Sequence, residues 1–250
     1  MNHTVAPPPS RIVLSLRALA FWLVFALTTV IAAILLLLMF PLSLKHRQKF
    51  ITSWVGFILW WLELTCRLDY VVSGMENITG DGPAIVCSKH QSTWETFALQ
   101  RIFPSQIWVA KRELLWLPFF GWGLALMKPI AIKRGTGRAA VTQLLRQGKA
   151  RLKEGLWVII FPEGTRVPPG KKGRYRIGGG ILAEHTGYPI VPVAHNAGEF
   201  WPRHSFIKLP GTIQVRIGKP ILPDGKSAQA LMDATEAWIE STMTDITKKS

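Results

Sequence analysis

The stretch Trp157-Val158-Ile159-Ile160-Phe161-Pro162-Glu163-Gly164-Thr165-Arg166 decides the fold. Its first five residues are a continuous apolar run rich in Val and Ile, typical of a strand buried on both faces of a parallel sheet. Pro162 and Gly164 then end the run, and Gly164 permits a backbone turn that a residue with a side chain resists. The segment predicts a buried strand followed by a polar loop that carries Glu163 and Arg166.

Similar short apolar runs lie on both sides of this strand. They are separated by Gly, Pro and charged residues, and they alternate with segments of helical periodicity. This alternation predicts an α/β domain with a largely parallel mixed sheet flanked by helices. The other expected strands are Leu68 to Val72, Ala84 to Cys87, Ile107 to Ala110, Ile190 to Val193 and Ile213 to Ile217, and the expected helices are Ser92 to Phe103, Gly137 to Glu154, Gly178 to His185 and Ala228 to Lys248.

The N-terminal quarter of the chain has a different character. Ala18 to Leu42 runs for 25 residues without a charge, long enough to cross a hydrocarbon core of about 30 Å as a helix. Phe50 to Leu62 is a second uncharged stretch of 13 residues with three tryptophans. It suits either a re-entrant or interfacial helix or a core helix. We therefore expect residues 1–65 to be a membrane-anchoring segment and residues 66–250 an α/β domain.

The balance of charge calls for an anionic partner. Thirty Lys and Arg against fifteen Asp and Glu give a net charge of +15, but the chain carries no recognisable nucleic-acid-binding motif. We expect the positive surplus to meet anionic membrane lipids or an acidic carrier protein, and no nucleic acid. The chain also lacks metal-ligand spacings and nucleotide-binding loops, so we expect no metal and no nucleotide cofactor.

His90 and Glu95 are the candidate catalytic pair. An alcohol becomes a good nucleophile only with a base nearby, and imidazole, whose ordinary pKa is about 6.5, suits that task. A helix that begins after Gln91 would place Glu95 about one turn in, where its carboxylate can orient the imidazole. The alternative is a loop histidine beside an unrelated carboxylate. Cys87 precedes His90 by three residues and is either a thiol nucleophile or, as is usual, a buried apolar residue.

Arg166 is the candidate anion ligand, because its guanidinium matches a phosphate bidentately. Further basic residues follow it, so this is either a broader anion site or a solvated basic loop; they are Lys171, Lys172, Arg174 and Arg176. In α/β sheets, ligands bind beyond the carboxyl ends of the strands. If the strands before His90 and before Glu163 are neighbours, their two loops face one cleft.

Four ordered blocks between about residues 80 and 200 resemble the glycerophospholipid acyltransferase family, typified by the 1-acyl-glycerol-3-phosphate acyltransferases. The family carries a His-x4-Asp block, a Lys-x-Glu-Leu type block, a Phe-Pro-Glu-Gly-Thr-Arg block and a Val-Pro block. This sequence departs from the pattern at Glu95, where the family usually has Asp. The corresponding stretches are His90 to Glu95, Lys111-Arg112-Glu113-Leu114, Phe161 to Arg166 and Ile190-Val191-Pro192-Val193.

By this resemblance, His90 would deprotonate the acceptor hydroxyl and Glu95 would orient it. Arg166 would hold the acceptor phosphate, with Lys111 and Arg134 as further phosphate contacts. The rest of the acceptor site would come from Glu163, Gly164 and Thr165. The apolar run from Leu114 to Trp122 would line an acyl-chain channel, dip into the bilayer or pack in the core.

The resemblance implies a membrane-bound O-acyltransferase. It would move a fatty acyl chain from acyl-carrier protein or acyl-CoA to lysophosphatidate, giving phosphatidate, at the cytoplasmic face of a bacterial inner membrane. Another lysophospholipid or a lyso-aminolipid is an alternative acceptor. A non-catalytic lipid-binding or scaffold protein is the other alternative, against which the intact His90, Glu163 and Arg166 argue. Basic residues flank the first apolar segment on both sides, so charge leaves its topology open.

Overall fold

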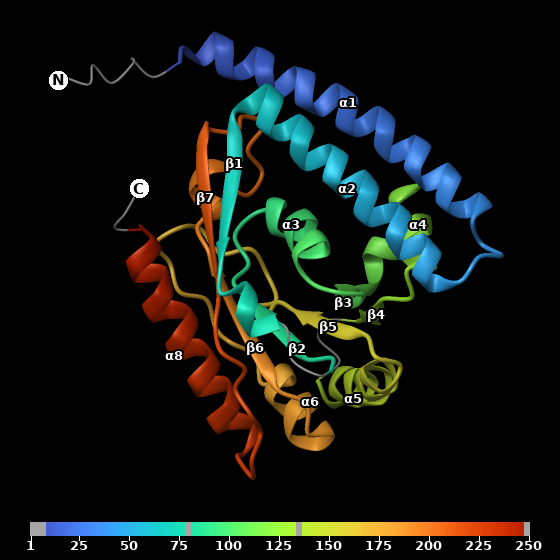
Figure 1. The fold of residues 1–250 in the computed structure, drawn as a ribbon, viewed down its shortest axis with the longest axis vertical. Helices are drawn as coiled ribbons and strands as arrows, with labels where there is room; N and C mark the ends of the chain where they lie inside the picture. Colours follow the sequence, from blue (N-terminus) through green and yellow to red (C-terminus); the bar gives the residue numbers. More distant parts are fainter. Residues whose placement is uncertain (1–8, 79–81, 134–136, 248–250) are drawn as a thin grey trace.

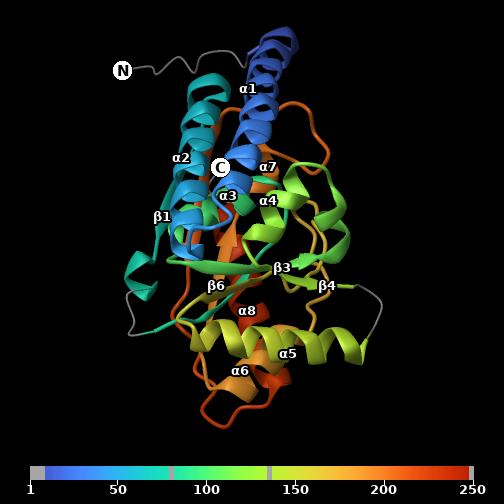
Figure 2. The same ribbon diagram turned by 90° about the vertical axis from the view of Figure 1, so that its right-hand side faces the viewer.

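The computed structural model describes residues 9–78, 82–133 and 137–247, which form a seven-stranded sheet with helices on both faces (Figures 1 and 2). The strand order is β1-β7-β6-β2-β5-β3-β4, and each neighbouring pair is parallel except β6 and β7. This confirms the predicted α/β fold with its largely parallel mixed sheet. The strands are β1 (Leu68–Ser73), β2 (Ile85–Ser88), β3 (Gln106–Lys111), β4 (Ile130–Ile132), β5 (Trp157–Ile160), β6 (Ile190–His195) and β7 (Gly211–Ile217).

The helices divide between the two faces of the sheet. α1, α2 and α3 pack on one face, and α5, α6 and α8 pack on the other. The central strands are buried on both faces, so successive residues alternate between the two cores: Val86 belongs to the first, and Ile85 and Cys87 to the second. The helices are α1 (Arg11–Leu38), α2 (Leu44–Cys66), α3 (Trp94–Ile102), α4 (Phe120–Leu126), α5 (Arg138–Lys153), α6 (Gly178–Thr186), α7 (Ala197–Phe200) and α8 (Ala228–Thr247), with short 3-10 turns η1 (Met75–Ile78) and η2 (Arg112–Trp116).

The first two helices lie side by side along one edge of the domain (Figure 1). Of the helices in the described ranges, α1 alone has the length and hydropathy that a membrane crossing requires. α2 has 23 residues and is therefore longer than the apolar stretch of 13 residues that predicted it. Its Ile58 and Leu62 are buried in the same core as Phe21 of α1 and the sheet residue Val193. α2 therefore forms part of the core of the domain, the alternative that the sequence left open.

The buried Lys208 connects α1 to the loop that precedes β7. The Nζ of Lys208 lies 3.7 Å from the ring centroid of Trp22, 4.5 Å from that of Phe21 and 4.8 Å from that of Trp201. The indole of Trp22 donates a hydrogen bond of 3.0 Å to the carbonyl oxygen of Phe206 in the same loop. Burial lowers the pKa of the Lys208 ammonium to about 7. These cation–π contacts join the N-terminal helix to the α/β domain.

Several short elements went unpredicted: β4, the segment from η2 to α4, η1 and α7. β4 is only three residues long and pairs along one side with β3, so its apolar run was too short to suggest a strand. The segment from η2 to α4 carries large apolar side chains that stay exposed, among them Trp116, Leu117, Phe120 and Trp122. It contacts α1, and it forms neither a buried core nor a wall of the cavity described below.

Candidate active site

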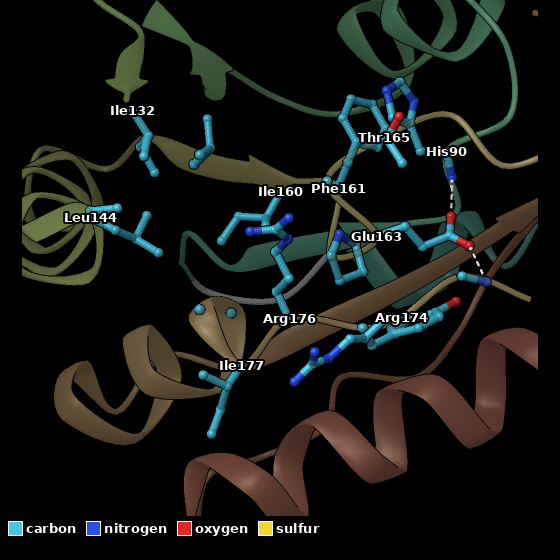
Figure 3. A pocket seen from close by; sticks show the side chains of 18 of the residues that line it. His90, Ile132, Leu144, Ile160, Phe161, Glu163, Thr165, Arg174, Arg176 and Ile177 are labelled. Atoms are coloured by element: carbon cyan, nitrogen blue, oxygen red, sulfur yellow. Dashed lines mark hydrogen bonds between the residues drawn. The ribbon is translucent and has the colours of Figure 1, made fainter. Parts of the chain in front are cut away.

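The candidate site lies at the carboxyl ends of β2, β5 and β3 (Figure 3). β5 pairs in parallel with both β2 and β3, so the loops after these strands meet at one edge of the sheet. The strands before the two motifs are therefore neighbours, which is the condition under which we expected their loops to face one cleft. His90 follows β2, and the turn from Phe161 to Arg166 follows β5.

His90 and Glu95 form the predicted pair. The imidazole Nδ1 lies 2.8 Å from Glu95 Oε1, and the same carboxylate accepts hydrogen bonds from the backbone N–H groups of Gln91 and Ser92. Burial opposes ionisation of Glu95, but its hydrogen bonds with His90 and with the backbone of Ser92 favour the carboxylate, and its pKa is lowered. The ionised carboxylate accepts from Nδ1–H, so Nε2 carries the lone pair that can take a proton. The extra methylene of Glu therefore does not prevent contact with the imidazole.

The His90 ring also packs against an aromatic side chain. It stacks on Phe161 with ring centroids 4.0 Å apart and planes 13° from parallel. The backbone carbonyl of His90 accepts a hydrogen bond from Val167 N, after the turn that follows β5. The two loops thus fix the orientation of the imidazole.

Glu163 connects the same two loops through a buried ionic network. Its Oε2 accepts a hydrogen bond of 3.0 Å from His90 N (Figure 3). Its Oε1 accepts one of 2.8 Å from Lys89 Nζ. Lys89 is 1% exposed and also pairs at 2.8 Å with Glu240 of α8, whose carboxylate accepts from Tyr175 Oη. The carboxylate predicted to bind the acceptor is therefore occupied with protein donors. Its contacts give it the role of holding the His90 loop in place.

His195, at the end of β6, forms a hydrogen bond with the residue that precedes His90. Its Nε2 donates to the carbonyl oxygen of Lys89 at 2.8 Å, and its Nδ1 accepts from Ala197 N at 3.3 Å. This pattern fits a neutral ring. Complete burial lowers the pKa of His195. The carbonyl before His90 thus has a fixed donor.

The turn after β5 places two arginines near the site. Gly164 has φ +65°, a conformation that favours glycine, and a Cβ there would meet Arg176 Nε at 2.9 Å. Arg166 Nη1 donates to the hydroxyl of Thr93 at 2.8 Å, next to the start of α3. Arg166 thus lies beside the His90–Glu95 loop.

A cavity of about 980 Å³ opens beside His90. Its apolar wall comes from β3, β4, β5 and α5, with Ile132, Ile160 and Leu144 among the side chains in Figure 3. Lys111, Glu163, Gly164 and Thr165 of the predicted site also line it, as do Arg174 and Arg176. The apolar part is suited to a hydrocarbon chain, and the cations are suited to an anionic group.

Cys87 does not take part in this site. Its side chain is 0% exposed in the core beneath α6, and burial raises the pKa of its thiol to about 12. The thiolate that a nucleophile needs is therefore strongly disfavoured. Of the two alternatives, the structure supports the buried apolar residue.

Comparison with known proteins agrees with this geometry. A family model described as acyltransferase matches residues 69–196. A 1-acyl-sn-glycerol-3-phosphate acyltransferase from Pseudomonas aeruginosa is 43% identical over 237 residues, covering 93% of this chain and 92% of the relative. The chain belongs to the glycerophospholipid acyltransferase family. A yeast 1-acyl-sn-glycerol-3-phosphate acyltransferase is 32% identical, over 88% of this acyltransferase and 72% of its own length.

The crystal structure of an acyltransferase from Thermotoga maritima, PlsC, has the same fold. Its TM-score is 0.78 at 24% sequence identity, and the match covers 93% of this acyltransferase and 95% of that chain. The part of the chain that the match leaves uncovered is smaller than α1 and α2 together, which make up about a fifth of the chain. The likeness therefore extends into the N-terminal helices.

The predicted site residues of the acyltransferase fall into three groups. His90, Glu95 and Glu163 form one connected cluster. Lys111 lies exposed at the end of β3, 4.0 Å from Glu113 Oε2, and Arg166 lies on the Thr93 side. Arg134 lies outside the described residues. Sequence reasoning missed Lys89, Thr93, His195 and Glu240. Thr93 lies within the His90 to Glu95 block and Lys89 lies next to it, whereas His195 and Glu240 belong to no motif.

Proposed function

We propose that this acyltransferase moves a fatty acyl chain from an acyl-carrier protein or acyl-CoA thioester to the free hydroxyl of 1-acyl-glycerol-3-phosphate, giving phosphatidate. The observation that carries the proposal is a histidine oriented by a buried carboxylate at the entrance of a cavity with an apolar wall and cationic lining. The names of the curated relatives support the choice of acceptor.

In the proposed reaction His90 acts as the general base. Its Nε2 takes the proton of the acceptor hydroxyl as the oxygen attacks the thioester carbonyl, so a C–O bond forms. The C–S bond then breaks, and the departing thiolate receives the proton from the imidazolium. Glu95 stabilises the imidazolium in between and keeps the ring in the correct tautomer. General-base catalysis of this kind contributes about 10²–10⁴ in rate. The thioester supplies the driving force, so the step needs no metal or cofactor.

Arg166 would hold the acceptor phosphate beside His90. A guanidinium can donate two hydrogen bonds to a phosphate while the hydroxyl of Thr93 steadies the side chain. Lys111 and Arg134 remain predicted phosphate contacts. Gly164 and Thr165 would shape the turn that carries Arg166.

We also propose that the enzyme acts at a membrane, at the cytoplasmic face of a bacterial inner membrane. The outward face of α1 is apolar, with Leu16, Leu23 and Leu27 each more than 60% exposed. The exposed apolar segment from η2 to α4 lies against this helix. Burying these surfaces in lipid removes them from water, and basic residues nearby would meet anionic headgroups.

Purified protein in detergent is expected to acylate lysophosphatidate from either thioester donor. His90→Ala should lower the rate at least about 10²-fold while its melting temperature stays near that of the wild type. Normal turnover by His90→Ala would refute the mechanism. Transfer only to a different lysophospholipid or lyso-aminolipid would refute the acceptor assignment. No transfer to any acceptor would favour the scaffold function.

A further inference from the structure

The arginines near the site form two groups with different surroundings. Arg166 does not line the cavity and bonds to Thr93, at the start of a helix that packs on the same face of the sheet as α1 and α2. Arg174 and Arg176 line the cavity and lead into α6, on the opposite face. The two groups therefore serve different approaches to the same histidine.

The proposed transfer requires both substrates at His90 together. In the proposed mechanism the acceptor hydroxyl attacks the donor thioester directly, and the buried Cys87 is unsuited to hold an acyl group in between. Both substrates are anionic. The acceptor carries a phosphate monoester, and both kinds of donor carry their thioester on a phosphopantetheine arm whose phosphate is negatively charged. Two anions held at once are most stable on two separate sets of cations.

Arg174 and Arg176 have the properties of the second set. Within the described residues neither guanidinium lies within 4.0 Å of a carboxylate, whereas the nearby Lys89 and Lys172 both form ion pairs. Arg176 is also positioned by its surroundings: its backbone N–H donates to the carbonyl oxygen of Pro162 at 2.9 Å. Its side chain crosses the cavity toward Ile160, over the space that Gly164 leaves by having no Cβ (Figure 3).

We infer that Arg174 and Arg176 bind the phosphate of the donor's phosphopantetheine arm, while Arg166 binds the phosphate of the acceptor. This inference rests on the proposed function. The geometry is consistent with the origin of each substrate. A lipid acceptor arrives from the face that carries the apolar helix α1, and a water-soluble donor arrives from the α6 face. With the arm at the two arginines, the donor's acyl chain can lie against the apolar wall at Ile132 and Leu144.

The kinetic test compares Michaelis constants for both substrates in matched variants. Arg176→Gln and Arg174→Gln are expected to raise KM for the donor at least about tenfold, because a hydrogen bond to a charged group is lost, and to leave KM for lysophosphatidate unchanged. Arg166→Gln should do the reverse. Arg146→Gln, an exposed arginine of α5 outside the cavity, is the control and should change neither constant.

Both donor types belong in this comparison. A rise for acyl-CoA and for acyl-carrier protein alike supports a site for their shared arm. A rise for acyl-CoA alone would assign the arginines to the nucleotide end of coenzyme A and overturn the inference. An increase in the acceptor KM with an unchanged donor KM, or no increase in either, would also overturn it.

A binding measurement keeps this inference separate from the proposed function. Calorimetry on the His90→Ala protein would compare 4′-phosphopantetheine with pantetheine, which lacks the phosphate. We expect the phosphorylated compound to bind at least about tenfold more tightly, and this preference to disappear in Arg174→Gln/Arg176→Gln. Equal affinity for the two compounds would refute the site. If the wild type transfers no acyl group, the proposed function fails while this test still decides the arginine site.

Discussion

Replacing Lys89 with methionine is expected to destabilise the protein strongly and to lower its turnover. The ammonium of Lys89 lies 2.8 Å from Glu163, whose side chain is fully buried, and 2.8 Å from Glu240. Methionine preserves much of the apolar stem but leaves the Glu163 carboxylate without its cation. Breaking a buried ion pair in this way costs about 3–5 kcal/mol.

For a chain of this size, each kcal/mol shifts the melting temperature by about 2–4 °C. Lys89→Met should therefore melt roughly 6–20 °C below the wild type, measured by thermal unfolding in detergent. Its kcat should also fall, because Glu163 accepts the backbone N–H of His90 and fixes the catalytic loop. Adding Glu163→Gln should recover part of the lost stability, since a neutral amide tolerates the absence of the cation.

Lys172 offers a matched control. Its Nζ pairs with Glu236 on the same helix, α8, at 2.5 Å, but the lysine side chain is 61% exposed. Exposed ion pairs contribute little, so Lys172→Met should melt within about 2 °C of the wild type. If Lys89→Met changes the melting temperature and kcat as little as this control, the buried network does not support the site and the reasoning is wrong.

Three further changes test other parts of the site. Glu95→Gln should lower kcat about 10²-fold or more with little change in KM, because the imidazolium loses its carboxylate. Glu95→Asp should retain most activity. A kcat of Glu95→Gln within about tenfold of the wild-type value would contradict this role. His195 is neutral when folded and takes a proton near pH 6.5 when unfolded, so the wild type should lose stability as pH falls through about 6.5. His195→Gln keeps a donor for Lys89 and cannot titrate, so its melting temperature should fall less between about pH 7.5 and about pH 5.5; an equal fall would count against the assignment. Leu144→Trp should fill part of the space along the apolar wall, and losing room for three methylene groups of the acyl chain costs about 2 kcal/mol. The kcat/KM for long acyl donors should then drop at least about tenfold relative to that for short ones. An unchanged ratio would show that the acyl chain lies elsewhere.

Local sequence signals predicted most of the fold and the catalytic pair. The runs of Val and Ile around Ile85 and Ile159 marked strands buried on both faces, because burial on both faces requires apolar side chains at successive positions. The spacing of His90 and Glu95 marked a contact within one turn of helix, and that contact exists at 2.8 Å. These features depend on neighbours in the sequence, so a single chain is enough to read them.

The length of α2 shows the limit of this reasoning. Its first turns contain charged and polar residues, including Arg47 and Gln48, which interrupt the apolar run. The sequence therefore predicted a shorter helix. In the fold both are buried, and Gln48 donates to the carbonyl oxygen of Gln106 at the start of β3. A buried polar side chain whose partner is a distant backbone group cannot be told from an exposed one in the sequence. The helix therefore extends beyond what its composition indicates.

The supporting residues of the site depend entirely on such distant contacts. Lys89 lies 151 positions before Glu240 and 106 before His195, yet its ammonium pairs with the first and its carbonyl accepts from the second. The sequence predicted a helix from Ala228 to Lys248, but helical periodicity carries no information about which polar residue reaches the His90 loop. The C-terminal helix therefore contributes to the chemistry without any motif, because it supplies one of the two carboxylates that hold the cation behind His90. In the proposed mechanism the motif residues perform the transfer, and the position of His90 depends also on residues outside every motif.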